Sequence, residues 1–92
     1  MRALAALACV AAFAPGVRAQ PAAPPGAAAC SGCHGRASSV VAPISGRDAK
    51  ELAAAMGEFR SGQRAATVMD RIAKGFSDDE TQAIATWLAA QH

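Results

Sequence analysis

The hexapeptide CSGCHG at residues 30–35 constrains this chain more than any other stretch. Two cysteines separated by two residues are used for zinc coordination and for thiol-disulfide exchange, among other chemistries. A zinc site needs about four ligands, and beyond Cys30, Cys33 and His34 the remaining candidate is His92 at the chain end. A thiol oxidoreductase places its cysteine pair after a β-strand, and no alternating β-branched run precedes Cys30. Both chemistries stand as alternatives to a third use of the motif.

The third use is covalent attachment of haem c, for which C-x-x-C-H is the signature. Within one helical turn the thiols of Cys30 and Cys33 face two vinyl groups on one porphyrin edge, and the imidazole of His34 then turns under the iron. Both sulfurs become thioethers, so no structural disulfide forms. The motif therefore predicts one covalently bound haem c, with His34 as the proximal iron ligand.

Composition indicates that the chain needs such a group to complete its core. Of the 92 residues 52% are apolar, but alanine dominates them, and there are only three Phe, one Trp and no Tyr. A single small domain built from these residues buries little area. A large, flat, apolar haem tied to the chain supplies the missing buried surface.

The first 19 residues are predicted to be a secretory signal peptide. Arg2 provides a positive start, residues 4–13 form an apolar run too short to span a bilayer, and the small-residue pattern at 17–19 precedes Gln20. An uncleaved membrane anchor and a disordered tail are the alternatives. A lipoprotein signal at Cys9 is disfavoured because that cysteine lies so close to the start.

With such a signal, the mature protein is expected in the periplasm. Cleavage of the segment makes the mature chain formally neutral. Lys plus Arg falls from 9 to 7, against 7 Asp plus Glu. Without a basic run, the chain is expected to bind no nucleic acid, and no membrane once the signal is removed. Residues 20–25 are a Pro/Ala-rich flexible lead-in, and residues 26–92 form the folded domain.

The hydrophobic pattern predicts an all-α fold without strands. Asp48 is expected to begin a helix whose apolar stripe is Leu52, Met56 and Phe59, and Ser77 with Glu80 forms a capping box for the last helix. Ile84, Trp87 and Leu88 give that last helix its buried stripe. The expected helices are four: 27–33, 49–60, 65–74 and one that begins after Ser77.

The loop at 36–46 is expected to cover one face of the haem. Pro43 has no N–H, so its neighbourhood offers a carbonyl without continuing a helix. A proximal histidine commonly donates its second ring N–H to such a carbonyl. We therefore predict that Pro43 places its carbonyl near His34, with a plain turn proline as the alternative.

An electron carrier also needs a second axial ligand, for which a thioether sulfur is usual. Met56 is in register with Leu52 and Phe59, as a core residue is, whereas Met69 lies on a late segment able to cross the opposite haem face. Met69 is therefore the predicted distal ligand and Met56 its rival. An iron left open or bound by water, or ligated by His92, is the remaining alternative.

These motifs together resemble class I cytochromes c. The string from Phe59 through TVM at 67–69 to RIAKGFSDDE at 71–80 is similar to the cytochrome subunit of flavocytochrome c sulfide dehydrogenase. The resemblance implies a small class I cytochrome c fold, with Met69 as the sixth iron ligand. Many such subunits carry two haem domains, whereas this chain has one C-x-x-C-H, as a single-haem form would.

The resemblance also implies a function and a partner. A periplasmic FAD-containing flavoprotein subunit oxidises sulfide, and the cytochrome takes its electrons singly and passes them to a downstream acceptor, without being catalytic itself. The alternatives are a free soluble carrier, the cytochrome subunit of another dehydrogenase, and a five-coordinate ligand-binding or sensor cytochrome. Four basic residues are expected to face solvent, with a docking rim or contact with a haem propionate as the alternatives: Arg60, Arg64, Arg71 and Lys74.

Overall fold

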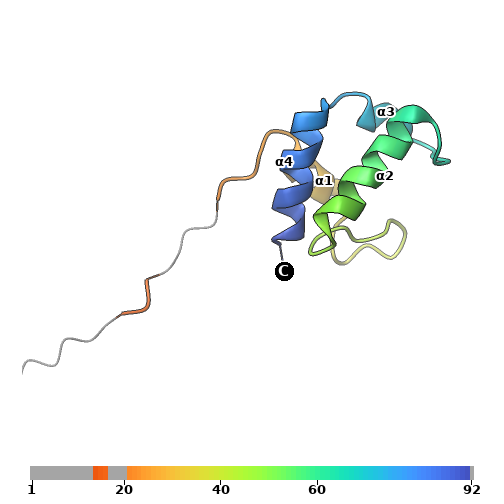
Figure 1. Cartoon of the computed structure of the whole chain (residues 1–92). Coiled ribbons are helices and arrows are strands. Elements are labelled where there is room, and N and C mark those ends of the chain that lie inside the picture. Colours follow the sequence, from red (N-terminus) through yellow and green to blue (C-terminus); the bar gives the residue numbers. More distant parts are fainter. Residues whose placement is uncertain (1–13, 17–20, 92) are drawn as a thin grey trace, which may run out of the picture.

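The computed structural model of the chain describes residues 14–16 and 21–91. Within these residues there are helices and no strands, so the predicted all-α fold is confirmed (Figure 1). The helices are four: α1 (Ala27–Cys33), α2 (Ala49–Ser61), α3 (Met69–Ala73) and α4 (Asp78–Ala89). The predicted signal peptide, apart from residues 14–16, lies outside the described part of the chain, as does His92.

The two long helices begin where the sequence places their caps. The Asp48 carboxylate accepts a hydrogen bond from the Glu51 N–H at 3.1 Å and starts α2. In α4 the Ser77 hydroxyl accepts from the Glu80 N–H at 3.2 Å, and the Glu80 carboxylate accepts from the Ser77 N–H at 3.1 Å. The predicted capping box is thereby confirmed, and it satisfies backbone donors that the first helical turn leaves free.

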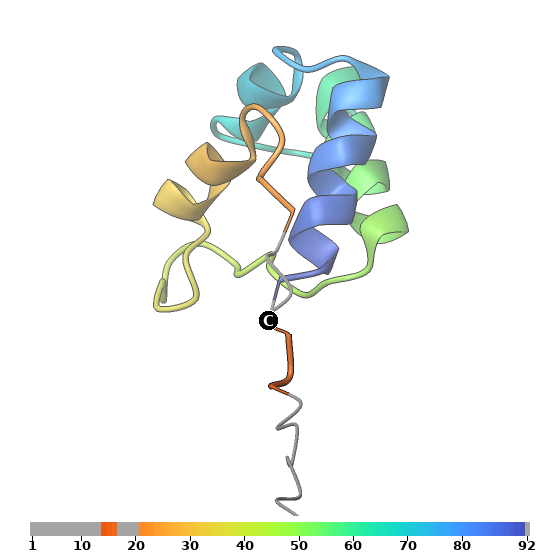
Figure 2. The ribbon, with the colours of Figure 1, turned by 90° about the vertical axis from the view of Figure 1, so that its left-hand side faces the viewer.

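The core forms where α4 packs against both α1 and α2, while α3 packs against α2 (Figure 2). Each of its side chains is at most 9% exposed: Ala27, Leu52, Ile84, Ala85 and Leu88. Of the stripe predicted on α2 only Leu52 is buried, since Met56 and Phe59 are half-buried, and Trp87 is half-buried at the edge of the core. No large side chain in the described residues is fully buried, which leaves the core small.

Gly26 holds α1 against the junction between α3 and α4. Its φ of +89° is a left-handed conformation that side chains disfavour. A Cβ at this position would lie 2.6 Å from a ring carbon of Phe76, closer than real contacts allow. The absence of a side chain at Gly26 therefore lets α1 start directly on the Phe76 ring.

The third helix is shorter than the sequence predicts, and its expected start at residue 65 is wrong. Residues 62–68, which we call the strap, are exposed and not helical, and α3 begins only at Met69. The strap starts at Gly62, whose φ of +80° ends α2. Thr67 and Val68 are β-branched and stiff, and Val68 provides no side-chain cap. The strap therefore crosses from α2 to α3 as an irregular, bent connection.

Candidate functional site

Helix α1 presents the two cysteines of the C-x-x-C-H motif one turn apart. Both thiols are free, with Cys30 half-buried and Cys33 exposed. Burial raises the pKa of the Cys30 thiol above its ordinary value, so this sulfur stays protonated at neutral pH. Because i and i+3 share a helix face, the spacing suits attachment of both sulfurs to one rigid group.

His34 follows directly as the C-terminal cap of α1. Its backbone N–H donates to the Cys30 carbonyl at 2.8 Å, which closes the last turn. The ring Nδ1 lies 2.7 Å from the Ala42 carbonyl oxygen. A carbonyl only accepts hydrogen bonds, so Nδ1 carries a proton, and the lone pair available to a metal is that of Nε2. The half-buried imidazole is therefore oriented with one nitrogen ready to bind a metal.

The carbonyl that contacts His34 belongs to Ala42, one residue before the Pro43 that the sequence indicated. The residue before a proline is pushed toward extended backbone, which turns its carbonyl out of any helical ladder. That carbonyl also belongs to the Ala42–Pro43 amide, so proline sets the local geometry without providing the acceptor atom. The sequence thus predicted the correct part of the loop, but it assigned the acceptor carbonyl to the residue after the one that provides it.

The loop at 36–46 is fixed at its far end. The Gly46 N–H donates to the Leu88 carbonyl of α4 at 2.9 Å. Within the loop the Val41 N–H donates to the Ser38 hydroxyl at 3.1 Å. The first bond ties the loop to the C-terminal end of α4, and the second stiffens the segment that contains Ala42. Together they help to hold the acceptor of the His34 hydrogen bond in place.

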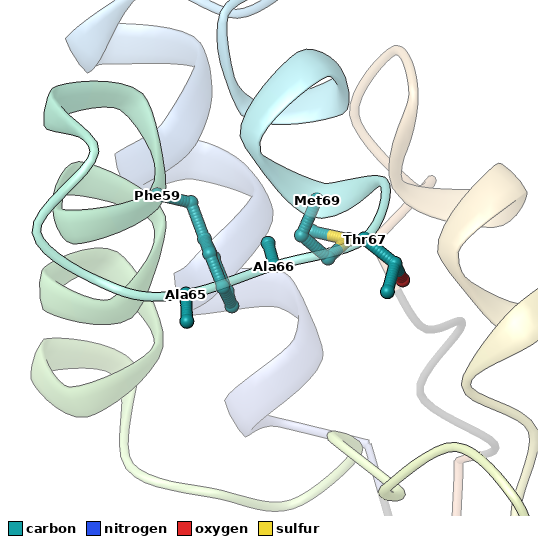
Figure 3. A pocket seen from close by; sticks show the side chains of 5 residues that line it. All are labelled: Phe59, Ala65, Ala66, Thr67 and Met69. Atoms are coloured by element: carbon teal, nitrogen blue, oxygen red, sulfur yellow. The ribbon is translucent and has the colours of Figure 1, made fainter.

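An open, mostly apolar hollow of about 500 Å³ lies beside the strap (Figure 3). Phe59 reaches it from α2, Met69 from the first turn of α3, and three strap residues complete its lining: Ala65, Ala66 and Thr67. Met69 is thus the methionine that the structure brings to a cavity. Met56, its predicted rival, is half-buried on α2 and does not line this hollow.

Three large apolar side chains outside the lining of this hollow also remain exposed, as the surroundings of a large apolar group would require. In the described part of the chain α1 does not contact α3, although both are attached to the α2–α4 pair. Val40, Val68 and Ile72, on the loop, the strap and α3, are 92%, 52% and 42% exposed. Exposed apolar area costs about 25 cal/mol per Å² relative to burial, so a flat apolar partner here would stabilise the chain. The two thiols and the imidazole of α1, and the Met69 thioether that lines the hollow, are donors of the kind that could hold a haem.

Arg64 attaches the strap to the last turn of α2. Its backbone N–H donates to the Glu58 carbonyl at 3.2 Å, its Nε donates to the Glu58 carboxylate at 2.7 Å, and its guanidinium lies 5.5 Å above the centre of the Phe59 ring. The sequence placed Arg64 on a solvated face or a docking rim and missed these contacts. Glu58 and Arg64 are six residues apart across Gly62, a spacing that no helix rule detects.

Arg60, grouped with Arg64 by the sequence, also pairs within the chain. Its guanidinium lies 2.5 Å from the Asp78 carboxylate and joins α2 to the start of α4. Arg71 and Lys74 form no ion pair with any described residue. Two of the four basic residues considered for docking are therefore engaged in ion pairs of the fold itself.

The four short helices and their packing are consistent with a small cytochrome c fold. No family model matches the chain. It is similar to the cytochrome subunit of sulfide dehydrogenase from Chlorobaculum tepidum, with 39% identity over 61 residues, 63% of this chain and 56% of that protein. The chain thus spans about half the length of this curated relative. The similarity supports a cytochrome c-like relationship.

No helix within the described residues has the length and apolar character needed to cross a bilayer.

Proposed function

We propose that this chain is a periplasmic electron-transfer protein, a c-type cytochrome with one covalent haem c. In this role it neither makes nor breaks a bond in a substrate. The observation that carries the proposal is the hydrogen bond between His34 Nδ1 and the Ala42 carbonyl at 2.7 Å. It leaves Nε2 as the ligand atom directly after a helical turn that bears two free thiols. This arrangement is of little use to a thiol oxidoreductase but suits a haem held from one side.

Each site residue then has one role. Cys30 and Cys33 hold the porphyrin edge through thioethers, His34 is the proximal ligand, and Met69 at the rim of the hollow is the distal ligand. When bound, haem supplies a one-electron Fe(III)/Fe(II) couple. A histidine and a thioether held by separate helices keep the same ligands in both oxidation states, which limits rearrangement during transfer.

The proposed donor is a FAD-containing flavoprotein subunit that oxidises sulfide, and the electrons leave to a downstream acceptor. The name of the Chlorobaculum tepidum relative supports this partner class. The predicted signal peptide supports export to the periplasm, and the C-x-x-C-H at residues 30–34 supports attachment of a haem to this domain. The rate of electron transfer between such partners depends on docking, which places the haem near the flavin.

Substitution of the two competing methionines tests the haem site. The holoprotein is produced in a host competent in haem c attachment and oxidised, and its weak far-red Met–Fe(III) absorption band is recorded. Met69→Ala should abolish this band, whereas Met56→Ala, the matched control, should retain it. If the band survived Met69→Ala and vanished in Met56→Ala, the assignment of the distal ligand would be wrong.

Isolation of the mature protein from its native periplasm tests the partner. A co-purifying FAD protein that reduces the haem only when sulfide is added would support the subunit. Reduction of the haem without such a partner would favour a free carrier, and free alkylatable thiols at Cys30 and Cys33 would exclude haem c altogether.

A further inference from the structure

The strap begins where the Gly62 N–H donates to the Phe59 carbonyl of α2 at 3.3 Å, and it is held to α2 at one further residue before it reaches Met69. Residues 62–68 are all exposed and lie in no helix, so the strap has little packing of its own. The contacts that hold it come from Arg64, which bonds Glu58 through both backbone and side chain and covers the Phe59 ring. Met69 follows Arg64 by five residues.

Phe59 connects this attachment to the hollow itself. The ring under the Arg64 guanidinium also lines the hollow together with Ala65, Ala66 and Met69. A change at Arg64 is therefore expected to alter both the position of the strap and the mobility of the Phe59 ring that lines the hollow. Glu58 is anchored in turn, because its carbonyl also accepts a hydrogen bond from the Ser61 hydroxyl at 3.2 Å.

We infer that Arg64 is a positioning residue for the distal ligand, and that its bridge to Glu58 and Phe59 determines how often Met69 leaves the iron. This inference rests on the proposed haem ligation by Met69. Arg64 and Glu58 are half-exposed, with side chains 50% and 41% accessible, so water screens their ion pair. Its effect is accordingly local: it changes the opening of the strap and leaves the stability of the α1–α2–α4 core almost unaltered.

Added imidazole measures that opening in the ferric holoprotein, because Met69 must leave before imidazole takes its place. The apparent affinity for imidazole is then proportional to the fraction of molecules with an open strap. Arg64→Ala should bind imidazole about fivefold more tightly than the parent protein, the factor expected when an exposed ion pair and a cation–π contact are lost together. Glu58→Gln, which removes only the charge pairing, should give about a twofold increase.

Two further variants separate positioning from general effects of charge. Arg64→Lys keeps the charge but loses the planar group over the Phe59 ring, so it should restore part of the parent affinity. Arg47→Ala is the matched control, because Arg47 lies just before α2, pairs with Glu51 of α2 at 3.7 Å and lies outside the strap. It should bind imidazole as the parent does. Urea unfolding of all four variants should show similar midpoints.

The result that overturns the inference is an Arg64→Ala protein with the imidazole affinity of Arg47→Ala. An increase in affinity that merely follows a lower urea midpoint would also overturn it, since that pattern indicates general destabilisation. Failure of the proposed function looks different: the parent protein would lack the Met–Fe(III) band, or Met69→Ala would retain it. The parent spectrum therefore distinguishes the two failures before any imidazole is added.

Discussion

The core between α1, α2 and α4 is closed by side chains alone, whereas the region around the strap and α3 is not. On the closed side Leu52, Ile84 and Leu88 are 9%, 5% and 4% exposed. On the open side Val68 and Ile72 are 52% and 42% exposed beside a hollow of about 500 Å³. The same helix, α2, borders both sides through Leu52 and Phe59. The difference teaches that the packed side can form a scaffold, while the open side needs a partner group to bury its apolar surface.

Removal of the attachment points should produce the largest effect, because it leaves the open side without its partner. With Cys30→Ala and Cys33→Ala together, the exported protein should lack covalent haem and lose its cooperative thermal transition, since so small a core stabilises a chain of this length weakly. Circular dichroism melting and a haem stain after denaturing electrophoresis measure both properties. A sharp transition in the double variant would show that the closed side is stable alone, and would contradict the comparison.

A cavity on the closed side should destabilise the holoprotein without changing its ligands. Leu88→Ala removes a side chain that is 4% exposed and should lower the free energy of unfolding by about 2–4 kcal/mol. The Met–Fe(III) band should keep its parent intensity at neutral pH. Gln82→Ala is the control, because Gln82 lies exposed on the same helix. Loss of the band in Leu88→Ala would show that the two sides are more tightly coupled than their packing suggests.

The smallest effect is expected at the start of α4, which supports the closed side from its end. Ser77→Ala removes the cap hydroxyl and should lower the free energy of unfolding by about 1 kcal/mol in urea titrations. Asp79→Asn provides a control in the same turn that leaves the capping box intact. Equal losses in the two variants would mean that charge, and not the cap, stabilises this turn.

The same cap makes stability depend on acid pH. The backbone N–H of Ser77, and secondarily its hydroxyl, lowers the pKa of Glu80 below its ordinary value. The folded protein therefore holds the carboxylate more strongly than the unfolded chain does. This stabilisation is present above the ordinary pKa of about 4.3 and is lost as pH falls through the lowered value. Glu80→Gln should flatten the acid limb of the urea midpoint plotted against pH, and an unchanged limb would contradict this assignment.

Local signals in the sequence predicted most of the fold. Side-chain caps act within a few residues, so Asp48 and Ser77 predicted the starts of α2 and α4. The bounds of α1 agree with the prediction as well. The predicted helix at 65–74 failed at its start because the bridge from Arg64 to Glu58 lies between segments, where helical periodicity carries no information.

The candidate site divides in the same way. The sequence by itself determined how Cys30, Cys33 and His34 are grouped, because two thiols and an imidazole at this spacing are brought together by a single helical turn. It also ranked Met69 above Met56. Only the tertiary structure decided that the Ala42 carbonyl orients His34, that Met69 and not Met56 lines the hollow, and that Arg64 holds the strap. These features depend on where loops and helices meet in space, and contacts between distant segments leave no periodic pattern in the chain.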